Sequence, residues 1–104
     1  MKTRVVNIKH QNQVESGEKL AYIGRPSIFG NPFKIGVNGN RQEIIIAYRE
    51  YLRQHKEANT DLWQEILKLK GKVLGCYCKP LACHGDIIVE FLENSSESTH
   101  LEGE

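Results

Sequence analysis

The sequence predicts a single small domain of the α/β or α+β class, in which a mainly parallel sheet is flanked by about three helices. Its length of 104 residues fits one hydrophobic core. Strand-like stretches lie near residues 5 and 74, two segments with helical periodicity separate them, and an amphipathic run follows the second stretch. A helical crossover between two strands of one sheet makes them parallel, with a right-handed connection.

The first 40 residues are expected to supply one strand, a short extended piece and a long loop. Residues 4–9 are rich in β-branched side chains, which favours a strand. The short apolar run at residues 20–23 stops at Gly24. Glycine, proline and asparagine are frequent from there to Asn40, which predicts a structured loop and excludes a helix.

Two helices are predicted next. Asn40 with Glu43 three residues later is typical of an N-cap with a capping box. The apolar face of this first helix has a period near 3.6 and consists of Ile44, Ile45, Tyr48, Tyr51, Leu52 and His55. Thr60 or Asp61 caps the second helix, and Gly71 is placed to end it in the left-handed conformation.

A strand at residues 72–75 and a last helix complete the predicted domain. This helix is expected to begin between Cys83 and Asp86 and to bury Ile87, Ile88, Phe91 and Leu92. Beyond it the chain has no apolar pattern. We therefore expect residues 1–94 to form the domain and residues 95–104 to be a disordered acidic tail.

The charge of the chain is unevenly divided. Residues 90–104 contain five acidic and no basic residues, so residues 1–89 hold fourteen basic against eight acidic residues, a net charge of +6. A basic body favours phosphates or nucleic acid as partners, and the alternative is a solvated surface of mixed charge. With no run of about eighteen apolar residues, no secretory signal and only three cysteines, the sequence predicts a cytoplasmic protein without a membrane partner.

All three cysteines, one histidine and one aspartate fall within residues 76–86, which we call the 76–86 turn. It is predicted to connect a strand to a helix, where α/β folds place ligands. One interpretation is a zinc site formed by Cys76, Cys78, Cys83 and His84, since three thiolates and one imidazole match a structural zinc shell.

A second interpretation makes this turn chemically active. Cys83 at a helix N-terminus would be stabilised as a thiolate, His84 would act as general base, and Asp86 would hold the imidazole or a substrate hydroxyl. In a third interpretation the free amide groups of the helix start bind phosphate, with added charge from Lys79, and Cys76 is a small buried hydrophobic residue. The sequence leaves these alternatives open.

Residues 24–36, which we call the 24–36 loop, are the other candidate part of a site. Structureless stretches of this length are uncommon in compact domains and are often functional. Arg25 and Lys34 offer cations, and Ser27 and Asn31 offer neutral hydrogen-bonding groups. Phe29 and Phe33 either stack on a base or pack inward. This mixture suits a nucleotide-like ligand.

The two signatures GRPSxxGNPF, at residues 24–33, and CxCKPxxCHGD, at residues 76–86, are specific in order and spacing. Together with residues 48–52 they resemble a family of small bacterial and phage proteins known as a domain of unknown function. The resemblance spans roughly residues 20–92 and implies a context in nucleotide or nucleic-acid metabolism or in interference with host signalling. For a phage-encoded chain, it implies the cytoplasm of the host.

From these observations we expect the 24–36 loop and the 76–86 turn to form one pocket for a phosphorylated, nucleotide-like ligand. Its ligand-binding residues would be Arg25, Ser27, Asn31, Lys34 and Lys79, and its reacting centre Cys83, His84 and Asp86. The alternative is a zinc-stabilised module that binds nucleic acid or protein. The sequence does not decide whether the ligand is turned over.

Overall fold

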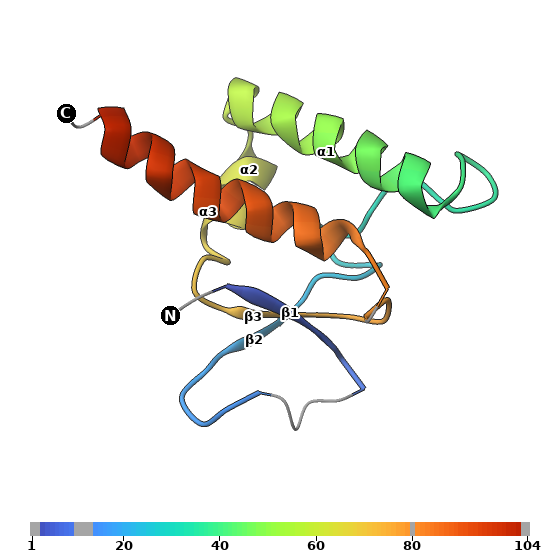
Figure 1. Ribbon diagram of the computed structural model, residues 1–104, viewed down its shortest axis with the longest axis horizontal. Helices are drawn as coiled ribbons and strands as arrows, with labels where there is room; N and C mark the ends of the chain where they lie inside the picture. Colours follow the sequence, from blue (N-terminus) through green and yellow to red (C-terminus); the bar gives the residue numbers. More distant parts are fainter. Residues whose placement is uncertain (1–2, 10–13, 80, 103–104) are drawn as a thin grey trace.

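A computed structural model of the chain describes residues 3–9, 14–79 and 81–102, with side chains as far as residue 93. Within these residues it contains a three-stranded sheet and three helices (Figure 1). The strands are β1 (Arg4–Asn7), β2 (Leu20–Tyr22) and β3 (Val73–Cys76). The helices are α1 (Arg41–Ala58), α2 (Asp61–Leu67) and α3 (His84–Glu102).

β3 is the central strand of the sheet, and both neighbours pair with it in parallel. The register places Val5 of β1 and Ala21 of β2 on either side of Leu74. The chain passes from β2 to β3 through α1 and α2, as expected for a crossover between parallel strands. The predicted α/β class is therefore confirmed.

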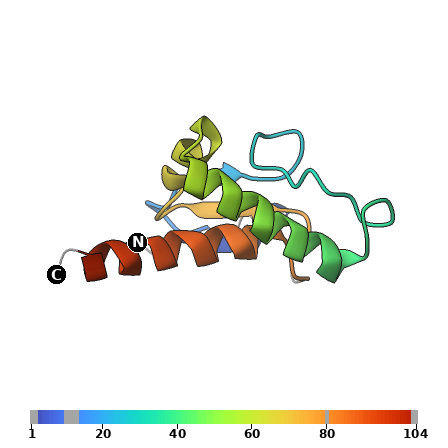
Figure 2. The same ribbon diagram turned by 90° about the horizontal axis from the view of Figure 1, so that it is seen from above.

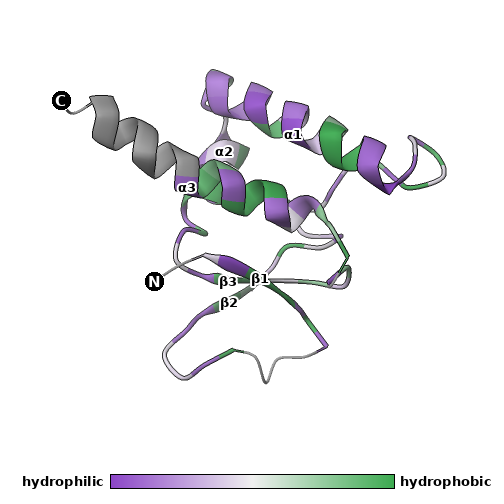
Figure 3. Cartoon of the chain, viewed as in Figure 1, coloured by the Kyte–Doolittle hydropathy of each residue, from purple (hydrophilic) through white to green (hydrophobic). Residues whose placement is uncertain are grey.

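The hydrophobic core lies between the sheet and the helices. Because side chains alternate along a strand, Val5, Ala21 and Leu74 share one sheet face, and all three belong to the core or pack against it. The helices contribute fully buried residues to the same core: Leu52 of α1, Ile66 of α2 and Ile88 of α3. Figure 3 shows hydrophobic and hydrophilic residues interleaved along α1, as the helical period requires.

α1 also packs on α3. Figure 2 shows the two helices side by side over part of their length. Arg49 of α1 pairs there with Glu90 of α3 at 2.9 Å, and the rings of Tyr48 and His84 meet edge to face, with centroids 5.2 Å apart. The N-terminus of α3 is thereby fixed against the middle of α1.

The predicted helix starts are confirmed. Asn40 accepts a hydrogen bond from the Glu43 N–H, and the Glu43 carboxylate accepts one from the Asn40 N–H, which completes the capping box. Of the two candidates for the second cap, the structure selects Thr60, whose hydroxyl accepts from the Trp63 N–H at 3.2 Å.

Two helix ends differ from the prediction. α2 ends at Leu67 and not at Gly71, because the backbone tightens into i→i−3 hydrogen bonds over residues 68–70; Gly71 has the predicted left-handed conformation (φ 85°) but follows this turn. α3 continues to Glu102, well past Leu92, the last residue of its predicted buried face. Residues 103–104 of the predicted tail lie outside the described residues, and the domain boundary at residue 94 stays a prediction.

None of the helices in the described part of the chain is both long enough and apolar enough to cross a membrane.

Ile88→Ala should lower the free energy of unfolding by about 2–5 kcal/mol, because it removes a fully buried side chain and leaves a cavity between α3 and the sheet. Urea unfolding followed by circular dichroism measures the loss. Ile46→Ala on α1 is the matched control, since Ile46 is 55% exposed; it should change stability by less than about 0.5 kcal/mol. Equal losses in the two variants would contradict this core assignment.

Candidate functional site

The parallel sheet brings the two sequence motifs to the same edge. β2 and β3 run in the same direction, so the 24–36 loop after β2 and the 76–86 turn after β3 leave the sheet side by side. The Ile23 N–H donates to the Gly75 carbonyl at 2.9 Å and continues the pairing of the two strands. The Ile23 carbonyl in turn accepts a hydrogen bond from Nε2 of His84 at 2.8 Å.

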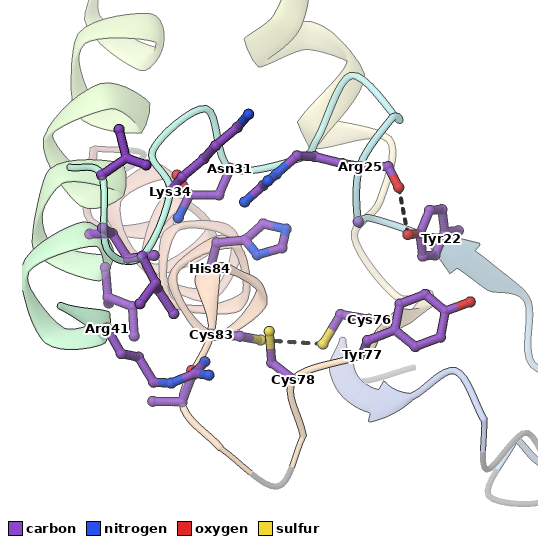
Figure 4. A pocket seen from close by; sticks show the side chains of 16 residues that line it. Tyr22, Arg25, Asn31, Lys34, Arg41, Cys76, Tyr77, Cys78, Cys83 and His84 are labelled. Atoms are coloured by element: carbon purple, nitrogen blue, oxygen red, sulfur yellow. Dashed lines mark hydrogen bonds between the residues drawn. The ribbon is translucent and has the colours of Figure 1, made fainter. Parts of the chain in front are cut away.

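Both motifs line one cavity of about 650 Å³ (Figure 4). The volume lies within the range of small-molecule sites. The loop supplies Arg25, Asn31 and Lys34, and the turn supplies Cys78 and His84. The meeting of the two motifs, on which the predicted pocket depends, is therefore present in the structure.

The cavity lining carries positive charge. Arg25, Lys34 and Arg41 contribute side chains, and no aspartate or glutamate is among the described residues that line it. Arg41, the first residue of α1, also donates from Nη1 to the Ala82 carbonyl at 3.0 Å and so connects α1 to the 76–86 turn. From the sequence, the helix start at residues 39–41 is only a weaker candidate anion contact, because Arg41 at such a position can equally point to solvent; the structure places Arg41 in the cavity lining.

Asn31 is the buried polar group of the loop side, with 6% of its surface exposed. Its Oδ1 accepts a hydrogen bond from the Phe33 N–H at 2.9 Å, which leaves the side-chain NH₂ without a protein partner in the described part of the chain. Figure 4 shows Asn31 with Arg25 and Lys34 around the same space. The cavity therefore offers an unused, buried amide donor.

Two tyrosines lie at the cavity wall. The rings of Tyr22 and Tyr77 meet edge to face, with centroids 6.0 Å apart, and the Tyr22 hydroxyl donates to the Arg25 carbonyl at 2.7 Å. Tyr77 is 60% exposed, so it is available to a ligand. Its place between two cysteines of the CxC motif was the signal that sequence reasoning passed over.

The two loop phenylalanines, for which stacking and packing were both open, do not line the cavity. Phe29 packs against the core, and its carbonyl accepts from the Tyr48 hydroxyl at 3.1 Å. The Phe33 ring meets the Tyr51 ring edge to face. Both residues anchor the loop to α1, which supports the packing interpretation.

His84 lines the cavity and is itself buried. Burial lowers its pKa, in spite of the hydrogen bond to the Ile23 carbonyl, which acts in the opposite direction. A neutral ring that donates from Nε2 keeps Nδ1 as a proton acceptor. His84 thus joins the two motifs and retains one basic nitrogen.

The three cysteines form a cluster in which all Sγ atoms lie within 4.8 Å of one another. Cys76 and Cys83 are buried, with their sulfurs 3.4 Å apart, and Cys78 is partly exposed. This arrangement can hold a metal ion. The predicted fourth ligand, His84, is not part of this cluster, and its Nε2 is hydrogen-bonded to the Ile23 carbonyl.

The buried thiols of Cys76 and Cys83 share one hydrogen bond, and this bond shifts their pKa values in opposite directions. Donation from Cys83 lowers the pKa of Cys76, assisted by the backbone N–H groups of Cys78 and Lys79 and opposed by burial. The pKa of Cys83 is raised by the same hydrogen bond and by burial. In this pair the hydrogen bond favours the thiolate of Cys76 over that of Cys83, and the predicted Cys83 thiolate stays a prediction.

Three predicted site residues lie outside the cavity: Ser27, Lys79 and Asp86. Asp86 accepts from the Cys83 N–H at 3.1 Å and from Nζ of Lys79 at 2.5 Å, so it caps α3 and neutralises the lysine. Burial alone would lower the pKa of Lys79, but the Asp86 carboxylate raises it above its usual value. The Ser27 hydroxyl accepts from the Phe29 N–H at 3.3 Å and shapes the loop.

Residues 6–94 match the family model described as Domain of unknown function (DUF4326). The Enterobacteria phage T4 protein described as "Uncharacterized 12.4 kDa protein in nrdA-td intergenic region" is 30% identical over 70 residues, which are 67% of this chain and 64% of that protein. The matched segment thus covers less than two thirds of that relative. No solved structure matches the chain.

Asp86→Ala should reduce the free energy of unfolding by about 1–2 kcal/mol, because α3 loses a capping contact and Lys79 loses its partner. Chemical unfolding measures the change. Asp61→Ala is the control. Asp61 is an exposed acid in the first turn of α2, but Thr60 caps that helix. This substitution should lower the free energy of unfolding by less than about 0.5 kcal/mol. A loss at Asp86 no larger than that at Asp61 would show that the contact does not cap α3.

Proposed function

This chain belongs to the family Domain of unknown function (DUF4326), and from this premise we propose that its cavity binds a phosphorylated, nucleotide-like ligand. The observation that carries the proposal is the charge of the lining: three cationic side chains from two segments surround one cavity, and its described lining contains no carboxylate. Cations that converge without carboxylate partners in the cavity favour an anion as their ligand.

Arg25, Lys34 and Arg41 would hold the phosphate groups. Guanidinium groups bind phosphate oxygens through two parallel hydrogen bonds, and an ammonium group adds a compact charge. Arg41 is already oriented by its hydrogen bond to the Ala82 carbonyl. Less ordering is therefore required of this side chain when the ligand binds.

The base and sugar would occupy the remaining walls. Tyr77 presents a largely exposed ring on which a base can stack, and Tyr22 supports it from the edge. The buried NH₂ of Asn31 would donate to a carbonyl or hydroxyl oxygen of the ligand. Ile44 and Ile45 of α1 add apolar surface to the same cavity.

For turnover, the cavity offers two reactive groups of the predicted centre. Nδ1 of His84 would accept a proton, and the Cys83 thiol would act as nucleophile once its proton is removed. Asp86 has both carboxylate oxygens engaged and would orient the start of α3. The free cysteines suit a reducing compartment, so we place the protein in the cytoplasm, which for a phage protein is that of its host.

Arg25→Ala and Arg41→Ala should each weaken the binding of ADP and of inorganic pyrophosphate at least tenfold, about 1.4 kcal/mol, because each removes a cation from the cavity. Isothermal titration calorimetry measures the affinity. Arg53→Ala is the matched control: Arg53 lies on α1, pairs with Glu50 and Glu57, and does not line the cavity.

Lys79→Ala should leave the affinity within about twofold, since Lys79 faces Asp86 and lies outside the lining. The proposal fails if the unaltered protein binds neither probe at millimolar concentration, or if the Arg25 and Arg41 variants bind as well as the Arg53 variant.

A second candidate function follows from the cysteine cluster. The protein would then be a zinc-stabilised module that joins β3 to α3 through metal and binds nucleic acid or another protein with its basic body. The supporting observation is the mutual proximity of the three Sγ atoms. Because the unfolded chain holds no preformed site for the ion, the binding energy of the metal adds to the free energy of folding.

The purified protein should contain about one equivalent of zinc, and its melting temperature should fall when a strong chelator removes the metal. Elemental mass spectrometry and thermal unfolding measure the two quantities. Cys78→Ser should lose the metal, whereas Gln42→Ser, at an exposed position on α1, is the control and should keep it. If the purified protein contains no metal and the chelator leaves its melting temperature unchanged, the zinc-stabilised module is excluded.

A further inference from the structure

The three sulfurs come from elements that the fold holds in place. Cys76 ends β3, Cys83 directly precedes α3, and Cys78 lies on the turn between them. With zinc–sulfur bonds of about 2.3 Å, tetrahedral geometry requires sulfur–sulfur distances of about 3.8 Å. The observed separations, 3.4 Å for Cys76 and Cys83 and no more than 4.8 Å for the others, need only small side-chain rotations to reach this value.

Backbone amides surround the two buried sulfurs. The N–H groups of Cys78 and Lys79 hydrogen-bond to Cys76, and the N–H of Gly85 hydrogen-bonds to Cys83. Hydrogen bonds of this kind orient metal ligands and reduce the charge on thiolates that share one ion. The 76–86 turn therefore provides three sulfur ligands and also backbone N–H groups that hold two of these sulfurs in place.

A fourth protein ligand is absent from this cluster. Among the histidines, cysteines and carboxylates of the described chain, only the three cysteines form the group, although His84 follows Cys83 directly. The His84 ring is held away by its hydrogen bond to the Ile23 carbonyl and by the edge of Tyr48. All three cysteines also line the cavity, so a metal between them would meet the cavity on its remaining side.

We infer that Cys76, Cys78 and Cys83 form a three-thiolate zinc site whose fourth coordination position opens into the cavity. That position would take a water molecule or an oxygen atom of a bound oxyanion. Three protein ligands with an exchangeable fourth are the arrangement of catalytic zinc, which activates water, whereas structural zinc is closed by four protein ligands.

The charges of the cavity fit this assignment. Zn²⁺ with three thiolates carries a net charge of −1, and Arg25, Lys34 and Arg41 line the same cavity to balance it and attract an anion. The anion part of the inference rests on the first proposed function, and the metal part rests on the second, the zinc site of the cysteine cluster. The two parts are therefore tested by separate measurements.

Co²⁺ titration of the purified, metal-free protein tests the ligand set, because tetrahedral cobalt thiolates absorb strongly in the visible region. We expect one Co²⁺ per chain, displaced by Zn²⁺, and at least tenfold weaker binding in Cys78→Ser. His84→Gln should retain the stoichiometry and the visible bands of the unaltered protein. No cobalt binding, or altered bands in a folded His84→Gln protein, would overturn the open three-thiolate site.

Azide added to the cobalt protein tests the open position. Its coordination should shift the visible bands of both the unaltered protein and His84→Gln, and unchanged bands at saturating azide would mean a closed site and overturn the inference. ADP binding by the chelator-treated, refolded protein is measured in parallel. If cobalt fails to bind while ADP still binds, the metal inference fails and the proposed anion site stands. If cobalt and azide bind while ADP does not, the open metal site stands and the proposed nucleotide site fails.

Discussion

The two-sided pairing of β3 is the constraint on which the rest of the structure depends. A strand of four residues is hydrogen-bonded to β1 on one side and to β2 on the other, and all four residues are buried. Side chains crowd this strand at Gly75, where an added Cβ would lie 2.6 Å from Cδ1 of Ile8 and would require that side chain to shift. Because the strands are parallel, everything that follows β2 and β3 must leave the sheet at one edge.

A buried contact joins the two motifs at that edge. The hydrogen bond between His84 and the Ile23 carbonyl fixes the start of α3 against the chain entering the 24–36 loop. It also occupies Nε2 of His84, the histidine that the sequence offers as a fourth zinc ligand. The same contact thus shapes the cavity and leaves the cysteine cluster with three ligands.

Charge pairing divides the basic residues into two groups. Arg49, Arg53 and Lys79 have carboxylate partners outside the cavity, with which their charges are largely neutralised. Arg25, Lys34 and Arg41 instead converge on a cavity whose described lining has no acid. The sequence gives residues 1–89 a net positive charge, but only the folded chain determines which of the basic side chains gather at the cavity.

Local patterns in the sequence determined the fold class, the capping box of α1 and the membership of the core, because each depends on residues within a few positions of one another. They also identified the two motifs that meet. Only the tertiary structure decided which side chains line the cavity. Lys79 is bound by Asp86 outside it, and Nε2 of His84 is hydrogen-bonded to the Ile23 carbonyl. Arg41 lines the cavity from the start of α1. These outcomes join residues up to 61 positions apart, a separation at which short-range periodicity carries no information.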